Sequence, residues 1–144
     1  MKLSLSVRTT SGTAGTAAWE MRTGATPGRF KLVEIGIFLA AATASQFGIG
    51  RPQAIGITPT SPVDFLPKDP NDLIASGSLQ SALAWGTGPT VPTTFFRRIS
   101  LPATIGTGVI WTFPVGVVVP VNSSLVLWNI GTNAVVDAYA VFEL

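Results

Sequence analysis

The dominant pattern in this chain is an alternation of apolar and polar residues, which is typical of half-buried β-strands. Near the amino terminus, the run Lys-Leu-Ser-Leu-Ser-Val places Leu3, Leu5 and Val7 on one face and polar side chains on the other. A longer run of the same kind covers residues 29–39. Its alternation changes register near Val33, which predicts a β-bulge at that point.

Further segments of this kind follow at the short, regular intervals expected of a sandwich or barrel. Turn-forming residues separate them, for example at Ser11–Gly15 and Gly24–Gly28. The strands expected after the first are 17–21, 29–39, 47–57, 82–85, 94–101, 108–113, 116–119, 124–130 and 135–142. We therefore expect an all-β fold, a single-domain antiparallel β-sandwich of jelly-roll type spanning residues 1–144.

Two segments stand apart from this series of strands. Residues 1–11 are expected to form an N-terminal strand or arm that pairs with its own sheet or a neighbour's, because an unpaired edge invites aggregation. Residues 58–78 are rich in proline and are expected to form a long loop. Within it, Phe65 and Leu66 lie between prolines, which limit the entropy lost on binding. We expect both, with the apolar residues of the arm (Leu3, Leu5 and Val7), to contact a partner.

The composition removes several classes of chemistry. The chain of 144 residues has no His and no Cys. Ser-His-Asp and Cys-His nucleophile pairs, thiolate or imidazole zinc sites and disulfides are therefore excluded. The glycine-rich segments 48–50 and 106–108 match neither a dinucleotide fingerprint nor a phosphate loop. We expect a structural or interaction protein that is not an enzyme and needs no cofactor.

The chain carries few charges, 11% of its residues, with a formal net charge of +2. That charge is too small for a protein that binds nucleic acid by electrostatics. Its long uncharged stretches contain several prolines, which remove backbone donors, so we expect no membrane-spanning helix. A surface with so little charge is expected to be covered by protein. We therefore predict a homo-oligomer of closed symmetry, which buries the same apolar residues on every copy.

The run Phe95-Phe96-Arg97-Arg98 mixes aromatic and cationic side chains on both faces of a strand. Base stacking beside phosphate contacts is one interpretation of such a run. Arginine and aromatic residues are also enriched in protein interfaces, and the rest of the chain supplies no basic stripe. We therefore name Phe96, Arg97 and Arg98 as candidates for an inter-subunit contact.

The carboxylates suggest two further possibilities. A glycosidase needs two of them facing each other across a cleft, and no motif here indicates such a pair. A calcium site could use the oxygens of Asp64, Asp69 and Asp72, but the spacing fails the EF-hand pattern because Ile74 and Gln80 occupy the glycine and glutamate positions. A local turn in which Asp69 accepts from nearby amides is favoured, so we expect no metal site.

Several segments together resemble a known family. They are Phe47–Pro52 (FGIGRP), Arg97–Pro102 (RRISLP), Gly108–Pro114 (GVIWTFP) and Ser124–Asn129 (SLVLWN), the last preceded by Pro120. Their strand and turn patterns are similar to those of small structural proteins of tailed bacteriophages, of the head decoration (cement) type.

This resemblance implies a β-sandwich that sits on the outer surface of an icosahedral capsid, commonly as a trimer, and clamps neighbouring capsid subunits. The expected partners are then the major capsid protein and other copies of the chain, and the expected location is the capsid surface of the virion. The family has no catalytic residues to carry over. A second virion β-module, from the tail, the baseplate or a host-recognition component, remains an alternative, as does a carbohydrate-binding or hydrolytic domain.

Overall fold

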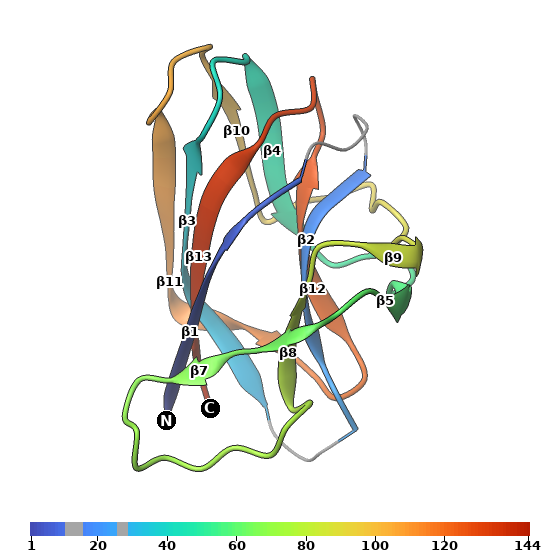
Figure 1. Ribbon diagram of the computed structural model, residues 1–144, viewed down its shortest axis with the longest axis vertical. Helices are drawn as coiled ribbons and strands as arrows, with labels where there is room; N and C mark the ends of the chain where they lie inside the picture. The colour runs from blue at the N-terminus through green and yellow to red at the C-terminus, as the bar shows by residue number, and fades with distance from the viewer. Residues whose placement is uncertain (11–15, 26–28) are drawn as a thin grey trace.

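The computed structural model describes residues 1–10, 16–25 and 29–144, and it consists of β-strands joined by turns and loops (Figure 1). No helix in the described part of the chain is long and apolar enough to cross a membrane. The strands are β1 (Lys2–Arg8), β2 (Thr16–Thr23), β3 (Phe30–Leu39), β4 (Ser45–Gly50), β5 (Ile57–Pro59), β6 (Val63–Asp64), β7 (Leu66–Pro67), β8 (Leu79–Ala82), β9 (Trp85–Thr87), β10 (Arg97–Leu101), β11 (Gly108–Val119), β12 (Ser124–Asn129) and β13 (Val136–Glu143).

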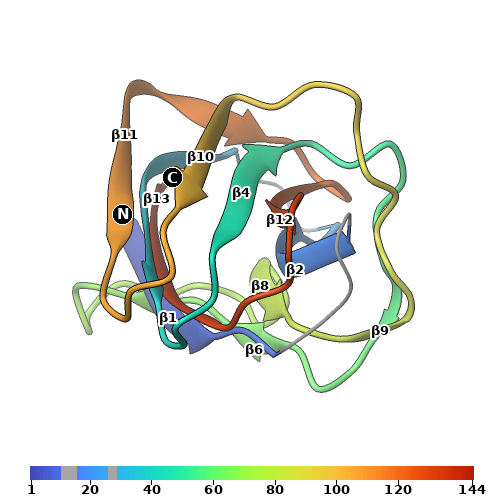
Figure 2. The same cartoon turned by 90° about the horizontal axis from the view of Figure 1, so that it is seen from above.

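These strands form two antiparallel sheets that pack face to face (Figure 2). The five-stranded sheet has the order β11-β3-β13-β1-β7, and the six-stranded sheet has the order β10-β4-β12-β2-β8-β6. Strands β5 and β9 pair with each other and form a separate two-stranded ribbon. The prediction of an all-β antiparallel sandwich is confirmed.

The core lies between the two sheets, as the alternating sequence requires. In β3, Ile35, Ile37 and Leu39 are buried against the opposite sheet. The centre of the core is aromatic. The ring of Phe65 stacks on Trp19 with 6.0 Å between centroids and meets Phe142 edge-on at 5.2 Å.

The N-terminal segment pairs with the sheet of its own chain. Strand β1 runs antiparallel to β13 along its whole length, from Lys2 opposite Glu143 to Arg8 opposite Asp137. This confirms the expectation that the segment is paired with a sheet. Leu3 is fully buried on the core side of this strand.

Residues 58–78 are more ordered than the predicted proline-rich loop, since they contain β6 and β7. Strand β6 extends the six-stranded sheet by pairing with β8, and two residues later β7 extends the five-stranded sheet by pairing with β1. Phe65 lies between the two short strands and points into the core. The segment therefore joins the two sheets along one open side of the sandwich (Figure 1).

The bulge predicted in β3 is confirmed. Glu34 pairs with Val141 and Leu32 pairs with Phe142, which leaves Val33 without a partner in β13. The strand on the other side is also irregular, so that 108–113 and 116–119 form one strand, β11, instead of two. Gly116 allows this irregularity because its φ of 80° lies in the region that favours glycine.

Several other strands differ in position from the prediction. The strand expected at 47–57 ends at Gly50, since Pro52 follows and lacks a backbone donor. The strand expected at 82–85 lies at Leu79–Ala82, where Ser81 faces the core and accepts a hydrogen bond from the indole of Trp19 at 2.7 Å. The turn expected at 11–15, and most of that expected at 24–28, lie outside the described residues.

Candidate functional site

The eight residues expected to contact a partner do not form one surface. Leu3, Leu5, Val7, Phe65 and Leu66 lie on or beside β1 and β7, at one edge of the five-stranded sheet. Phe96, Arg97 and Arg98 lie at or just before β10, an edge strand on the opposite side of the sandwich (Figure 2). A partner that contacts both groups must therefore extend around the molecule or bind it through two separate surfaces.

Within the first group, burial separates core residues from surface residues. Leu3 and Phe65 are 0% and 1% exposed, so neither side chain is available to a partner. The expectation that Leu3 and Phe65 contact a partner is thus corrected: both belong to the core, where the ring of Phe65 packs between Trp19 and Phe142. The next residue, Leu66, is 61% exposed.

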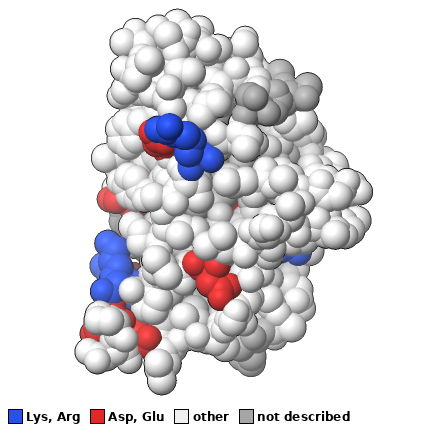
Figure 3. Space-filling model, in the orientation of Figure 1, with Lys and Arg blue, Asp and Glu red and all other residues white. Residues whose placement is uncertain are grey.

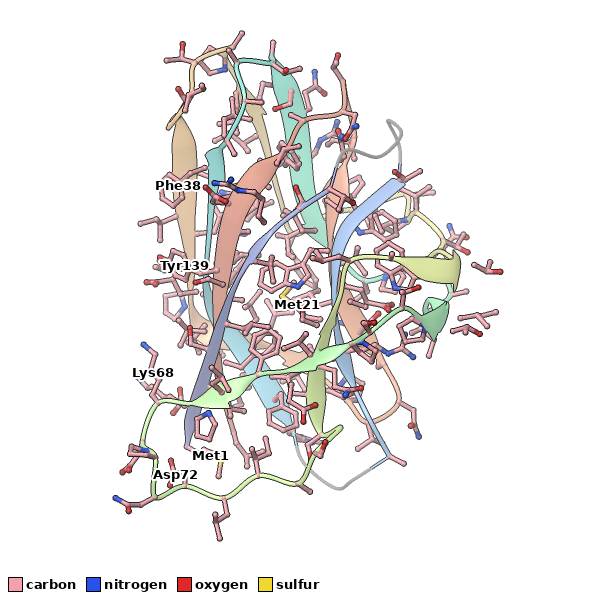
Figure 4. All side chains as sticks on the ribbon, viewed as in Figure 1. Met1, Met21, Phe38, Lys68, Asp72 and Tyr139 are labelled. Carbon is pink, nitrogen blue, oxygen red and sulfur yellow. The ribbon has the colours of Figure 1, made fainter. Side chains whose placement is uncertain are left out.

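Leu66 lies in β7, at the end of the sandwich where both termini lie (Figure 1). The amide of Leu144 donates to the carbonyl of Met1, and the amide of Lys68 donates to the carbonyl of Lys2, so these segments are tied together. We call the exposed residues Met1, Leu66, Leu73 and Leu144 the terminal patch. Figure 4 shows Met1, Lys68 and Asp72 at this end. The two terminal residues carry no sequence signal, because the pairing that joins them is long-range.

In the second group, arginines and phenylalanines pair with one another. The guanidinium of Arg98 lies over the ring of Phe95 at 5.5 Å, and that of Arg51 lies over the ring of Phe96 at 4.9 Å. Arg97 instead lies over Phe113 of β11, at 5.1 Å. These cation–π contacts occupy the cations within the chain. The role of Arg51 was not expected, since it is far from this run in the sequence.

Charge is sparse over the visible surface. Figure 3 shows small, separate groups of acidic and basic residues on a face that is otherwise uncharged. Arg8 and Asp137 form an ion pair, in which the Nε and Oδ1 atoms are 2.7 Å apart. The hydrogen bond from Arg8 lowers the pKa of Asp137. Both side chains are exposed, so the pair adds little to stability.

On the outer face of the five-stranded sheet, Tyr139 lies across Gly36. A Cβ added at Gly36 would lie within 3 Å of the tyrosine ring, so the absence of a side chain there makes room for it. The Tyr139 hydroxyl donates to Oε2 of Glu34 at 2.8 Å. Burial raises the pKa of Tyr139, and the hydrogen bond to Glu34 raises it further. Tyr139 and Phe38 lie near each other on this face (Figure 4).

We expect Tyr139 to titrate above the ordinary range of a tyrosine, and Glu34→Gln to bring its pKa back down. The chain contains one tyrosine, so tyrosinate absorbance measured against pH reports this residue alone. The raised native pKa contributes stability that is fully present below the unfolded pKa, about 10, and is lost as the pH rises through the native pKa. Glu143→Gln is the control and should leave the titration unchanged. A native titration curve identical to that of the unfolded chain would contradict this assignment.

A buried carboxylate lies on the outer face of the six-stranded sheet. Glu20 is 0% exposed, and its Oε1 accepts from the Arg22 guanidinium at 2.9 Å and from the Trp85 indole at 3.0 Å. Its Oε2 accepts from the Gly56 amide at 3.0 Å and from the Ser124 hydroxyl at 2.9 Å. Each oxygen of the carboxylate therefore accepts two hydrogen bonds. Glu20 therefore holds the β5–β9 ribbon against the sheet, and it is not placed to act on a substrate.

Two of the three acidic residues considered for calcium, Asp64 and Asp69, are engaged locally. Asp64 accepts from the Ser76 hydroxyl, the Gln80 amide and the Gly77 backbone at 2.8–3.1 Å. Burial raises its pKa, but these hydrogen bonds outweigh that effect and lower it. Asp69 accepts from the Asn71 backbone, as the predicted turn requires. Among the described residues, no three acidic side chains gather into a metal site.

Comparisons with known proteins add no assignment. No family model, no curated protein and no solved structure matches this chain. The resemblance to phage head decoration proteins therefore stays a prediction, and the function has to be argued from the fold and its surfaces.

Proposed function

We propose that this chain is a structural protein of a bacteriophage particle, which binds the outer surface of the capsid and stabilises the shell. The support comes from the resemblance of its strand and turn segments to decoration proteins, and from a β-sandwich with a surface poor in charge. Its expected partners are the major capsid protein and other copies of itself. The proposal assigns the chain no reaction and no cofactor.

We further infer that the sandwich is a jelly roll. The longest strands of the first half of the chain pair with those of the second half in nested order: β4 with β10, β3 with β11, β2 with β12 and β1 with β13. Consecutive members of this series also change sheet, except at the β4–β10 turn point. A long antiparallel hairpin rolled into two sheets has this pairing. Viral capsid proteins use jelly rolls widely, which favours a virion role.

The observation that carries the proposal is the terminal patch. Leu73 is 90% exposed and Leu66 is 61% exposed, at the end of the sandwich that holds both chain ends (Figure 1). Exposed apolar residues at one end of a protein with few charges favour a protein contact there. The patch is flanked by Lys68 and by the acidic residues Asp69 and Asp72, which gives it the polar rim expected of an interface.

A trimer is the oligomer we favour on the shell. Closed symmetry buries the same apolar residues on every copy and leaves no free end. Three-fold positions on an icosahedral lattice also match such a trimer. Burial of apolar surface contributes about 25 cal/mol per Å², so an interface of modest size suffices when many copies bind one particle. Sedimentation velocity of the purified protein measures its oligomeric state directly.

We expect the double substitution Leu66→Ser and Leu73→Ser to weaken binding to purified capsids by about tenfold or more, equivalent to about 1.4 kcal/mol. Both side chains are exposed, so the free energy of unfolding should change little. The assay is cosedimentation of the purified protein with capsids that lack it. Ile105→Ser, in the loop between β10 and β11 at the other end of the sandwich, is the matched control (Figure 1).

The proposal also predicts where the protein is found. Virus particles propagated from a genome that encodes this chain should contain it in a fixed ratio to the major capsid protein. Location of the chain on tails alone would support the alternative of a tail or baseplate module. A monomer at micromolar concentration that binds no capsid would refute the proposal.

A further inference from the structure

A groove of about 300 Å³ lies beside the β5–β9 ribbon, where β2 begins. This volume is at the lower end of the range for small-molecule sites, roughly 300–1,000 Å³. Apolar side chains of Trp85, Leu83 and Pro89 line it together with the polar residues Thr10, Asn129 and Asn133. The groove is distinct from the terminal patch.

The aromatic wall of the groove is held in place. The Trp85 indole donates to Oε1 of Glu20 at 3.0 Å, and its five-membered ring lies against Gly56, where an added Cβ would lie 2.4 Å from Cδ1. At the other end of the indole, a Cβ added at Gly88 would lie 3.9 Å from Cε3, so a side chain at position 88 would contact the ring. An aromatic ring that is held in place and lines a groove loses little entropy when a ligand packs on it.

The polar side of the groove contains an unsatisfied acceptor. Asn129 is 2% exposed, and its Nδ2 donates to Oδ1 of Asn133 at 2.9 Å. Its Oδ1 is buried and has no hydrogen-bond partner within the described part of the chain. Buried polar atoms are nearly always paired, so an orphan acceptor in the wall of a groove indicates a missing donor.

The groove offers no charge to a ligand. Its described lining residues include no Lys, Arg, Asp or Glu. The carboxylate of Glu20 contacts the indole of Trp85, but it already accepts hydrogen bonds from four donors. An ionic ligand would lose its hydration there without gaining a counter-charge. The ligand must therefore be neutral.

We propose that this groove binds a neutral sugar ring of pyranose size. A pyranose has an apolar face of C–H groups that packs on an indole, and hydroxyl groups at its edge that donate to amide oxygens. Trp85 and Pro89 supply the apolar contact, and Asn129 and Asn133 supply the hydrogen bonds. The inference does not rest on attachment to a capsid. On a particle, it would add recognition of surface glycans to a structural role.

Two substitutions test the site without removing the contact between Trp85 and Glu20. Gly88→Leu places a side chain against Cε3 of the indole in the groove, and the backbone φ of Gly88 is not in the glycine-favoured region. Asn133→Ala removes the partner of Asn129 and part of the polar rim. Thr87→Leu is the matched control, because Thr87 is the exposed residue immediately before Gly88 and does not line the groove. Urea denaturation confirms that each variant is folded.

The probes are the methyl glycosides of glucose, galactose, mannose and N-acetylglucosamine, with methyl glucuronide as a charged analogue of glucose. Binding is measured by saturation-transfer NMR and isothermal titration up to about 10 mM, a range suited to weak sites. We expect at least one neutral glycoside to bind, with affinity about tenfold lower in Gly88→Leu and reduced in Asn133→Ala. Thr87→Leu should bind as the natural chain does.

Three outcomes would overturn the assignment of this groove. One is that no neutral glycoside binds up to that concentration. Another is binding that Gly88→Leu leaves unchanged, which would place the sugar elsewhere. The third is tighter binding of the glucuronide than of the glucoside, which would show that the ligand is anionic. None of these results bears on capsid attachment, which the substitutions at Leu66 and Leu73 test separately.

Discussion

Phe65→Ala is expected to destabilise the protein by about 3–5 kcal/mol, the usual cost of truncating a buried phenylalanine. The ring of Phe65 is 1% exposed and packs between Trp19 and Phe142, which belong to opposite sheets. Its removal leaves a cavity at the centre of the core. Since domains of this kind are stable by about 5–15 kcal/mol, the loss is a large fraction of the total.

The neighbouring residue provides a sharp control. Leu66 is 61% exposed, so Leu66→Ala is expected to change the free energy of unfolding by no more than about 0.5 kcal/mol. Urea denaturation followed by tryptophan fluorescence measures both variants under the same conditions. Equal effects of the two substitutions would contradict the assignment of Phe65 to the core and Leu66 to the surface.

The substitution at Phe65 also reports on the connection between the sheets. Phe65 is the single residue between β6, which pairs with β8, and β7, which pairs with β1. Its backbone amide donates to the carbonyl of Leu79 at 3.0 Å. Loss of the ring should therefore speed amide exchange in β6 and β7 more than in the central strands.

The sequence predicts best those strands whose alternation is set by a single buried face. β1 and β3 show the expected alternation, and the bulge at Val33 lies where the register of apolar residues changes. In these strands, the local pattern and the tertiary environment agree, because one side faces the core and the other faces outward.

Prediction was weaker wherever a residue's environment is created by distant parts of the chain. The short strands β6 and β7 have no period of their own, and their pairing depends on the open sides of sheets formed by other segments. Leu79–Ala82 was misplaced because Ser81 reads as a surface residue, although it faces the core and satisfies the Trp19 indole.

The candidate sites were also hard to predict, because they combine residues that are distant in the sequence. Phe96 and Arg98 belong to one aromatic and cationic run, and the cation–π partner of Arg98, Phe95, lies in the same run. The partner of Phe96 is Arg51, which comes from a distant position in the sequence. The acceptor of Asn129 and the indole of Trp85 meet at one groove only after the β5–β9 ribbon folds over the sheet. No spacing in the sequence indicates that meeting.

Glu20→Gln is expected to destabilise the protein by about 3–5 kcal/mol, the range for breaking a buried ion pair on one side. The substitution keeps the size of the side chain but replaces one acceptor oxygen with an NH₂ group. The carboxylate accepts four hydrogen bonds, two on each oxygen. Either orientation of the new amide therefore places its NH₂ group against donors, and the half-buried Arg22 loses its counter-charge.

The structural consequence should be local before it is global. Glu20 accepts from the Gly56 amide and the Trp85 indole, which flank the β5–β9 ribbon. We expect amide exchange to accelerate first in residues 53–90, measured by mass spectrometry under native conditions. Faster exchange spread evenly over all strands would indicate a general loss of stability instead.

A comparison with the ion pair between Arg8 and Asp137 isolates the effect of burial. Arg8 and Asp137 approach to 2.7 Å and Arg22 and Glu20 to 2.9 Å, so the two distances are similar. The side chains of Arg8 and Asp137 are 68% and 52% exposed, whereas those of Arg22 and Glu20 are 18% and 0% exposed. Asp137→Asn should therefore leave the urea midpoint nearly unchanged, because water replaces the lost partner. If the two substitutions cost the same, burial would not be what makes Glu20 important. A loss of stability in Glu20→Gln but not in Asp137→Asn would show that the buried carboxylate of Glu20 stabilises the contact between the ribbon and the sheet.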